Sequence, residues 1–329
     1  MTRTPGPHAP AAPVPGTDGL TLPEFLRRIA DWYDAPDASP DPRLTRLGDV
    51  FTAAGLAALH RAAAGSAWSE FRLRPADGRR GELYARMYRL AREALDTKEI
   101  DAFFFVHKEP GLRLRFRTGP HPTAEPVHRA APRLWQDRGC VASWVPAVYE
   151  PEEHLFGGPV SMNSVHRIFT ADSLLWAGRH ASAERTGPSW ALSLLMVRAL
   201  FEELGVSGWE DREIWDLLRR RAHRRFTGAT PPSWQGTAEG LGRLWAEPER
   251  LRSLLDPLCL EALGEYRAAV RHACALWHET YFGCPGADVG PREAAAFLVV
   301  HHWNRAHLPM ERQIAVTEAL VGPHNLAVL

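Results

Sequence analysis

Strict alternation of arginine and apolar residues over positions 111–118, with the sequence GLRLRFRT, is the feature that most constrains the fold. Successive side chains of a β-strand point to opposite faces, so this segment predicts a strand with two chemically different faces. One face carries Arg113, Arg115 and Arg117, and the other carries apolar side chains that need a hydrophobic cover. The arginine face is either a solvated surface or a site for an anion or a substrate, because planar guanidinium groups suit the oxygens of carboxylates and phosphates.

Composition bounds the class of protein. The chain has 329 residues, of which 45% are hydrophobic, and this is enough to build a sizeable core. The 39 basic and 39 acidic residues balance, so we expect no nucleic-acid partner held by bulk charge. Only Lys98 and Lys108 among the basic residues are lysines, so arginine is the usual cation of this chain and a solvated arginine face stays a valid interpretation.

The terminal segment and the cysteines predict a soluble protein without a cofactor. Residues 1–18 are rich in Pro, Ala and Gly, lack the apolar stretch of a secretion signal, and predict a disordered tail. No run reaches the roughly 20 apolar residues of a bilayer span, so we expect no membrane association and a cytoplasmic location. The four cysteines are scattered, and no glycine-rich nucleotide loop follows a strand. We therefore expect no disulfide, no metal and no nucleotide cofactor.

Periodicity predicts an α+β fold, with a small mixed or antiparallel sheet and flanking helices in the N-terminal half and a helical C-terminal half. Helices are expected over residues 22–33, 49–64, 81–96 and 124–137, and strands over residues 68–75, 103–106, 111–118 and 140–152. From residue 162 onward only helical patterns occur, interrupted by Pro and Gly. We expect a single domain over residues 19–329, with its α+β part ending at residue 158 and its helical part beginning at residue 159.

Three stretches occur in an order that is typical of one family. They are FFFVHKEPGLRLRFR, then VYEPEEHLFGG followed by FTADSLLW, and finally VVHHWNRAHLPMERQ near the C-terminus. Together they resemble the C-terminal elimination domain of lantibiotic dehydratases and its stand-alone relatives in thiopeptide biosynthesis, over about residues 68–325. The resemblance implies work on a ribosomally made peptide, either elimination of glutamate from glutamylated Ser or Thr or assembly of a pyridine ring.

Two positions depart from the eliminating members of this family. In those members the strand arginines, a further arginine before the aromatic-Gly-Gly step and a late histidine engage the glutamyl ester. By resemblance Arg113 and Arg115 match the strand arginines, whereas Leu155 and Val300 stand at the other two positions. A glutamate leaving group carries a carboxylate that needs a charged partner and a proton donor. The departure therefore favours the pyridine synthases over the eliminating enzymes.

The resemblance to pyridine synthases implies a definite reaction. Two dehydroalanines of one leader-bearing, azole-containing peptide combine in a formal aza-[4+2] cycloaddition, and loss of water and of the leader peptide then gives a pyridine-centred macrocycle. The implied partners are the modified precursor peptide, leader plus dehydrated core, and other enzymes of the pathway. Two alternatives stay open: the glutamate-eliminating half of a split dehydratase, and a noncatalytic subunit that binds the leader.

The matched motifs hold the candidate site residues. The candidates for proton transfer are Tyr149, Tyr281, His278, His301 and His302. The candidates for substrate binding are Arg113, Arg115, His154, Asn304 and Arg305, of which the last two also hold their motif together. Adjacent helical residues point about 100° apart, so only one of the two neighbouring histidines faces a site, and we expect it to be His302. The alternative for each residue is a hydrogen bond within the core.

Overall fold

The computed structural model describes residues 13–34, 41–121, 126–182, 187–284 and 286–322. The predicted α+β class is confirmed, with one four-stranded antiparallel sheet in the N-terminal half and helices in the C-terminal half. Residues 1–12 of the predicted disordered tail lie outside the described residues. Pro13 lies within them and forms an isolated antiparallel bridge with Thr21.

Contacts divide the chain into two compact units, residues 1–63 and 64–329. The first unit contains α1 (Leu22–Asp34) and most of α2 (Pro42–Ala67). The start of α1 is stabilised by Glu24, whose carboxylate accepts hydrogen bonds from the backbone N–H and the hydroxyl of Thr21. The predicted single domain beginning at residue 19 stays a prediction.

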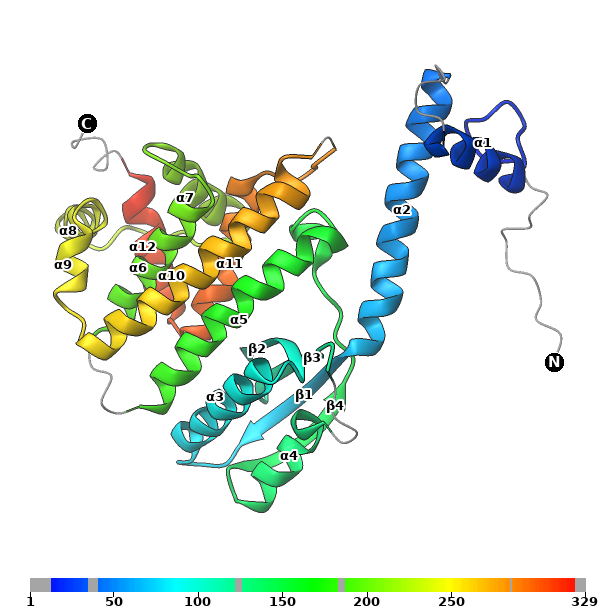
Figure 1. Ribbon diagram of the computed structural model, residues 1–329. Coiled ribbons are helices and arrows are strands. Elements are labelled where there is room, and N and C mark those ends of the chain that lie inside the picture. Colours follow the sequence, from blue (N-terminus) through cyan, green and yellow to red (C-terminus); the bar gives the residue numbers. More distant parts are fainter. Residues whose placement is uncertain (1–12, 35–40, 122–125, 183–186, 285, 323–329) are drawn as a thin grey trace. The chain divides into compact units, whose positions relative to one another are not determined.

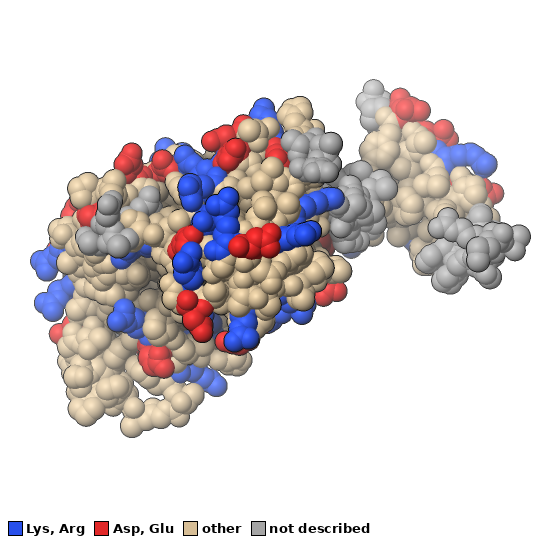
Figure 2. Space-filling model, turned by 90° about the horizontal axis from the view of Figure 1, so that it is seen from below, with Lys and Arg blue, Asp and Glu red and all other residues tan. Residues whose placement is uncertain are grey.

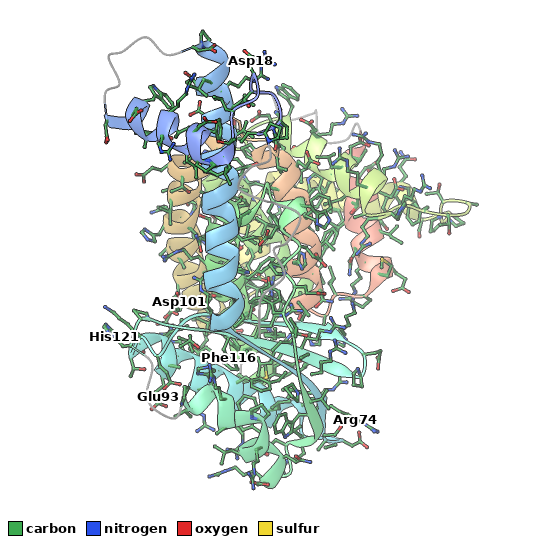
Figure 3. The ribbon with its side chains drawn as sticks, turned by 90° about the vertical axis from the view of Figure 1, so that its right-hand side faces the viewer. Asp18, Arg74, Glu93, Asp101, Phe116 and His121 are labelled. Atoms are coloured by element: carbon green, nitrogen blue, oxygen red, sulfur yellow. The ribbon has the colours of Figure 1, made fainter. Side chains whose placement is uncertain are left out.

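The sheet of the second unit has the strand order β2-β3-β1-β4, and all its pairs are antiparallel. The strands are β1 (Trp68–Pro75), β2 (Ile100–Lys108), β3 (Gly111–Thr118) and β4 (Val141–Ala147). The predicted hairpin is therefore confirmed as β2 and β3. Figure 3 labels Asp101 near one end of the sheet and Arg74 near the other. This sheet is the platform on which the candidate site lies.

The apolar face of the sheet is covered by α3 (Arg80–Asp96) and α4 (Val127–Asp137). The ring of Tyr84 on α3 lies 5.7 Å from that of Phe105, and the ring of His128 on α4 lies 5.3 Å from that of Phe116. Leu114, on the same face, is fully buried. The alternation in β3 thus places its apolar side chains in the core and leaves its arginines on the opposite face.

The helical part packs beside the outer strand β2 (Figure 1). It begins with the short 3₁₀ turn η1 (Glu153–Leu155) and α5 (Pro159–Ala181). The further elements are α6 (Ser189–Glu203), α7 (Glu210–Arg221), α8 (Trp234–Ala246), α9 (Pro248–Arg252), α10 (Pro257–Trp277), the π-helical turn η2 (His278–Phe282), α11 (Pro291–Arg305) and α12 (Met310–Val321). Of the helices in the described part of the chain, none has the length and apolarity that a bilayer crossing requires.

Helices α5 and α11 cover the free edge of β2. The hydroxyls of Thr170 and Ser173 on α5 accept hydrogen bonds from the backbone N–H groups of Phe103 and Phe105. An outer strand presents unpaired backbone groups, and these side chains satisfy them. The sheet and the helical part are thereby joined along one line, with the arginine face of the sheet turned toward the junction.

Candidate functional site

A cavity of about 290 Å³ lies on the arginine face of the sheet. Its wall comes from β2, β3, the segment after β4, α5 and α11. The lining residues are Phe104, Val106, His107, Lys108, Arg113, Arg115, Tyr149, Glu150, Glu152, Leu155, Phe156, Met162, Phe169, Phe297, Val300, His301 and Asn304. All three family-like stretches of the sequence contribute to it, so motifs separated by almost 200 positions meet at one place.

The three arginines of β3 have three different environments. Arg117 donates from Nε to Asp101 at 2.5 Å and from Nη1 to Asn163 at 3.2 Å. Arg115 donates from Nε to the buried carboxylate of Glu70 at 2.7 Å. Nε of Arg113 is buried, and no described residue forms a hydrogen bond with it. Arg113 is therefore the strand arginine whose charge is free to meet a ligand in the cavity.

Tyr149 stands at the cavity wall and is held from several sides. Its ring centroid lies 4.8 Å from that of Trp68 and 4.7 Å from the guanidinium carbon of Arg115. Its hydroxyl lies 2.9 Å from Nε2 of His166 on α5. Burial raises the pKa of Tyr149, and the positive charge of Arg115 acts in the opposite direction. Tyr149 is therefore a neutral phenol with its hydroxyl at the boundary between cavity and core.

His166 was not among the candidates from sequence. It lies between Phe156-Gly157-Gly158 and the FTADS motif, in a helix whose apolar pattern does not distinguish it from a core position. Burial lowers the pKa of His166 well below its ordinary value, and the charges of Arg117 and Arg115 act in the same direction. Only the contact with Tyr149 marks it as a site residue.

The structure brings His301 to the cavity, which corrects the expectation that His302 faces the site. His301 lines the cavity, and its Nε2 lies 3.2 Å from Oε2 of Glu152. Burial lowers the pKa of His301, although the hydrogen bond with Glu152 opposes this effect. The same hydrogen bond lowers the pKa of Glu152. A neutral His301 that donates to an ionised Glu152 is the form that these directions favour near pH 7.

His302 points to the other side of α11 because that side packs against α5 and α6. Its Nδ1 lies 2.6 Å from Oδ1 of Asp172, and its Nε2 lies 2.8 Å from Oγ of Ser193. This Ser-His-Asp arrangement is fully buried and does not line the cavity. Its contacts are those of a core hydrogen-bond network, which fixes α11 against its neighbours.

Asn304 and Arg305 hold the end of α11 in place. The side chain of Asn304 accepts a hydrogen bond from the backbone N–H of His107 at 2.7 Å and donates one to the carbonyl of His107 at 2.8 Å. Nη1 of Arg305 donates to Oδ2 of Asp172 at 2.9 Å, and its guanidinium carbon lies 4.1 Å from the ring centroid of Phe169. Asn304 also lines the cavity, whereas the buried Arg305 does not.

Three of the sequence candidates lie away from the cavity lining. His278 is on the π-helical turn beside Phe282, and His154 is exposed on η1. The hydroxyl of Tyr281 accepts hydrogen bonds from the backbone N–H groups of Asp288 and Val289 at 3.1 and 3.0 Å. These contacts describe Tyr281 as an anchor for the loop before α11.

Tyr281 also explains the Gly-Gly step before α5. Gly157 has φ +85°, and a Cβ at this position would overlap the Tyr281 hydroxyl. Gly158 has φ +100°, again a conformation that favours glycine. The Gly-Gly step therefore lets the chain turn tightly from the cavity wall into α5.

The positions that depart from the eliminating pattern are both at the cavity. Leu155 and Val300, which stand where an arginine and a histidine are expected, line it together with apolar neighbours such as Phe297. Among the described residues, no group of three or more His, Cys, Asp or Glu side chains is arranged to hold a metal ion. Basic and acidic residues are intermixed over the face drawn in Figure 2.

The family profile described as lantibiotic biosynthesis dehydratase C-term matches residues 68–321, which begin at β1 and include every cavity residue. The chain belongs to this family. A similar solved structure is the tRNA-dependent lantibiotic dehydratase MibB from Microbispora sp. 107891, with 21% identity and a TM-score of 0.54. The similarity covers 80% of this chain and 28% of MibB, so this family member spans less than a third of that enzyme.

A second solved structure, TsrL, matches with 14% identity and a TM-score of 0.26, covering 78% of this chain and 98% of TsrL. No curated protein matches the chain. The likeness to MibB shows the fold, and the family profile shows the membership.

Proposed function

We propose that this protein is a cofactor-independent thiopeptide pyridine synthase. It joins two dehydroalanines of a leader-bearing, azole-containing peptide by a formal aza-[4+2] cycloaddition and then releases water and the leader peptide. The observation that carries the proposal is the chemistry of the cavity at Leu155 and Val300. Both side chains line the cavity, and neither can bind a carboxylate or transfer a proton.

The state of the strand arginines supports the same proposal. Arg115 matches an arginine that engages the glutamyl ester in the eliminating relatives, but here Glu70 already neutralises its charge at 2.7 Å. Two cations at this wall have no acidic partner among the described residues, namely Arg113 and the exposed Lys108. A glutamate leaving group would have to bind to these two. Dehydroalanines carry no charge, so the cycloaddition does not need a second cation in the cavity.

The proposed reaction makes two demands, and the cavity has groups for both. The first is to hold two alkenes of a flexible peptide in reacting geometry, and such positioning is in general worth roughly 7 to 11 kcal/mol. The apolar wall of Phe104, Phe169 and Phe297 suits this task. The second is proton transfer to and from the amide that becomes the iminol of the azadiene.

We assign the proton transfers to Tyr149 and His301, because both line the cavity. Arg113 is assigned to binding a peptide carbonyl or carboxylate, since a guanidinium group offers hydrogen-bond donors and no acceptor. His302 and Arg305 then contribute indirectly, because they hold α11 in position. The partners that this proposal implies are the modified precursor peptide and other enzymes of the pathway, in the cytoplasm.

A noncatalytic leader-binding subunit is the second candidate, and one observation favours it. β4 is the outer strand on the opposite side of the sheet from β2, and its outer edge has no strand partner among the described residues. Val145 on this strand is 54% exposed, and Val148 just after it is 80% exposed. A free strand edge with apolar side chains can bind an extended peptide by adding a strand.

One mass-spectrometric assay separates these functions. The purified protein is incubated with dehydrated, azole-containing precursor peptide and, separately, with a glutamylated serine peptide. We expect a pyridine-containing product and a released leader from the first peptide and no change in the second. Dehydroalanine from the glutamylated peptide would instead show elimination, and tight binding without either product would show a binding subunit.

A further inference from the structure

The contact between Tyr149 and His166 connects the cavity wall to the core of the protein. The hydroxyl of Tyr149 lies 2.9 Å from Nε2 of His166. Of these two residues, Tyr149 lines the cavity and His166 does not. His166 is 4% exposed, and its ring lies 4.6 Å from that of Trp68 and 5.8 Å from that of Phe104. The histidine is thus enclosed by aromatic rings on the core side of the tyrosine.

Tyr149 is the one polar partner of the His166 side chain among the described residues. Nδ1 of His166 is buried, and no hydrogen-bond partner for it is present in this part of the chain. Buried polar atoms are normally paired, and an unpaired ring nitrogen lowers stability. A histidine at this position therefore carries a structural cost, which a function through Tyr149 would explain.

Burial and the surrounding charges keep His166 neutral. Burial is the larger cause that lowers its pKa, and the charges of Arg117, Arg115 and Arg305 act in the same direction. Tyr149 also stays protonated, because burial disfavours the phenolate. The contact is consequently a hydrogen bond between a neutral phenol and a neutral imidazole. It is not an ion pair.

The geometry leaves free hydrogen-bonding positions on the Tyr149 hydroxyl. A phenol has one O–H donor and an oxygen that accepts. When Nε2–H of His166 donates to this oxygen, the O–H proton is free to point into the cavity. The ring itself cannot turn away, because Trp68 and Arg115 hold it at 4.8 and 4.7 Å.

We propose that His166 is a positioning residue that fixes the Tyr149 hydroxyl so that it converts the substrate amide into its iminol. Tyr149 gives its O–H proton to the amide oxygen and takes the amide N–H proton onto the same phenol oxygen. The C=O double bond becomes C–OH, the C–N bond becomes C=N, and the tyrosine ends as the neutral phenol it was. His166 donates from Nε2 throughout and does not change its charge. This inference rests on the proposed pyridine synthase function.

The kinetic test uses Tyr149→Phe, His166→Phe and the double variant with dehydrated precursor peptide. His166→Phe keeps an aromatic ring in contact with Trp68 and Phe104 and removes the hydrogen bond. We expect Tyr149→Phe to lower kcat roughly 100-fold or more, and His166→Phe roughly 10- to 100-fold with little change in KM. The double variant should be no slower than Tyr149→Phe alone, because His166 acts only through the hydroxyl.

Rescue and a matched control separate positioning from structural support. His166→Gln keeps an N–H donor near the position of Nε2 and should recover part of the kcat lost in His166→Phe. Tyr84→Phe is the control, because Tyr84 is a buried tyrosine that does not itself line the cavity and whose hydroxyl makes a similar contact, at 2.6 Å from Nε2 of His107. Its kcat should be unchanged. Multiplying losses in the double variant, or full activity of His166→Phe, would overturn the proposal.

A measurement without turnover keeps this inference distinct from the function on which it rests. If the wild-type protein forms no pyridine, the proposed function fails, and ¹⁵N NMR of histidine-labelled protein still tests the hydrogen bond. We expect a neutral His166 with its proton on Nε2 between pH 6 and 8, and a shift of that resonance in Tyr149→Phe. A proton on Nδ1, or a charged ring at pH 6, would contradict the assigned geometry.

Discussion

Arg113, Arg115 and Arg117 come from one alternating segment, yet their electrostatic roles differ. Arg115 and Glu70 form a buried ion pair, with 12% and 2% of the side chains exposed. Arg113 has no acidic partner of this kind among the described residues, and it faces the cavity. The difference separates an arginine that maintains the structure from one that can bind a ligand.

Replacing these two arginines should therefore have different effects on stability. Arg115→Ala removes the hydrogen-bonded partner of the buried Glu70 carboxylate and leaves it with the more distant Arg72 at 3.8 Å. Breaking a buried ion pair in general costs about 3 to 5 kcal/mol. Arg113→Ala removes no ion pair and should change the free energy of unfolding by less than about 1 kcal/mol. Urea denaturation measures both values. The double variant Glu70→Gln/Arg115→Gln should recover part of the loss, and equal unfolding midpoints for the two single variants would contradict this distinction.

The sequence predicted which side chains of β3 share a face, but not which residues pair with its arginines. The alternation in residues 111–118 determines which side chains share a face, because that follows from strand geometry alone. The pairing of Arg115 with Glu70 depends on the register between β1 and β3, which brings together residues 45 positions apart. The adjacent histidines of α11 are a similar case. Helix geometry predicted that one of them faces the site, but which one depends on the packing of α11, and it is His301 that lines the cavity.

At the scale of elements, β2 is an outer strand whose free edge is covered by side chains from two helices. Asn304 on α11 pairs with both backbone groups of His107, and Thr170 and Ser173 on α5 pair with Phe103 and Phe105. The hairpin itself was predictable from its apolar run and turn. This lateral cover was not, because hydroxyl and amide side chains in a helix give no periodic signal.

Asn304→Asp should weaken the junction between α11 and β2. The aspartate can still accept from the N–H of His107, but it cannot donate to the carbonyl, and two oxygens then face each other. The His107 carbonyl is partly buried at this contact, and leaving a buried polar group unpaired costs about 1 to 3 kcal/mol. Guanidinium denaturation measures the change, with Asn163→Asp as the matched control because Asn163 is exposed on α5. A loss of the same size in both variants would show that the clamp on β2 is not the cause.

At the scale of the whole molecule, the family match and the cavity lie in the same compact unit. The profile covers residues 68–321, and the second unit covers residues 64–329. This unit holds several histidines at the junction of sheet and helices, including the buried His166 and the half-buried His107 and His180. The pKa of each is lowered chiefly by burial, and that of His107 falls to about 4.

These three histidines should make the free energy of unfolding fall as the pH is lowered below about 6.5. Unfolding exposes each ring and returns its pKa to about 6.5, so the unfolded chain takes up protons that the folded chain does not. The stabilisation from His107 is fully present above pH 6.5 and is lost as the pH falls toward about 4. The stability lost between pH 7.5 and 5.5 is about 1.4 kcal/mol. One pH unit of this range lies below the unfolded pKa of about 6.5, and each such unit costs about 1.36 kcal/mol. Urea midpoints at pH 7.5, 6.5 and 5.5 should decrease in that order, and His107→Gln should flatten the profile by about 1.4 kcal/mol. A wild-type midpoint that stays constant or rises at pH 5.5 would show that these histidines are charged in the folded protein.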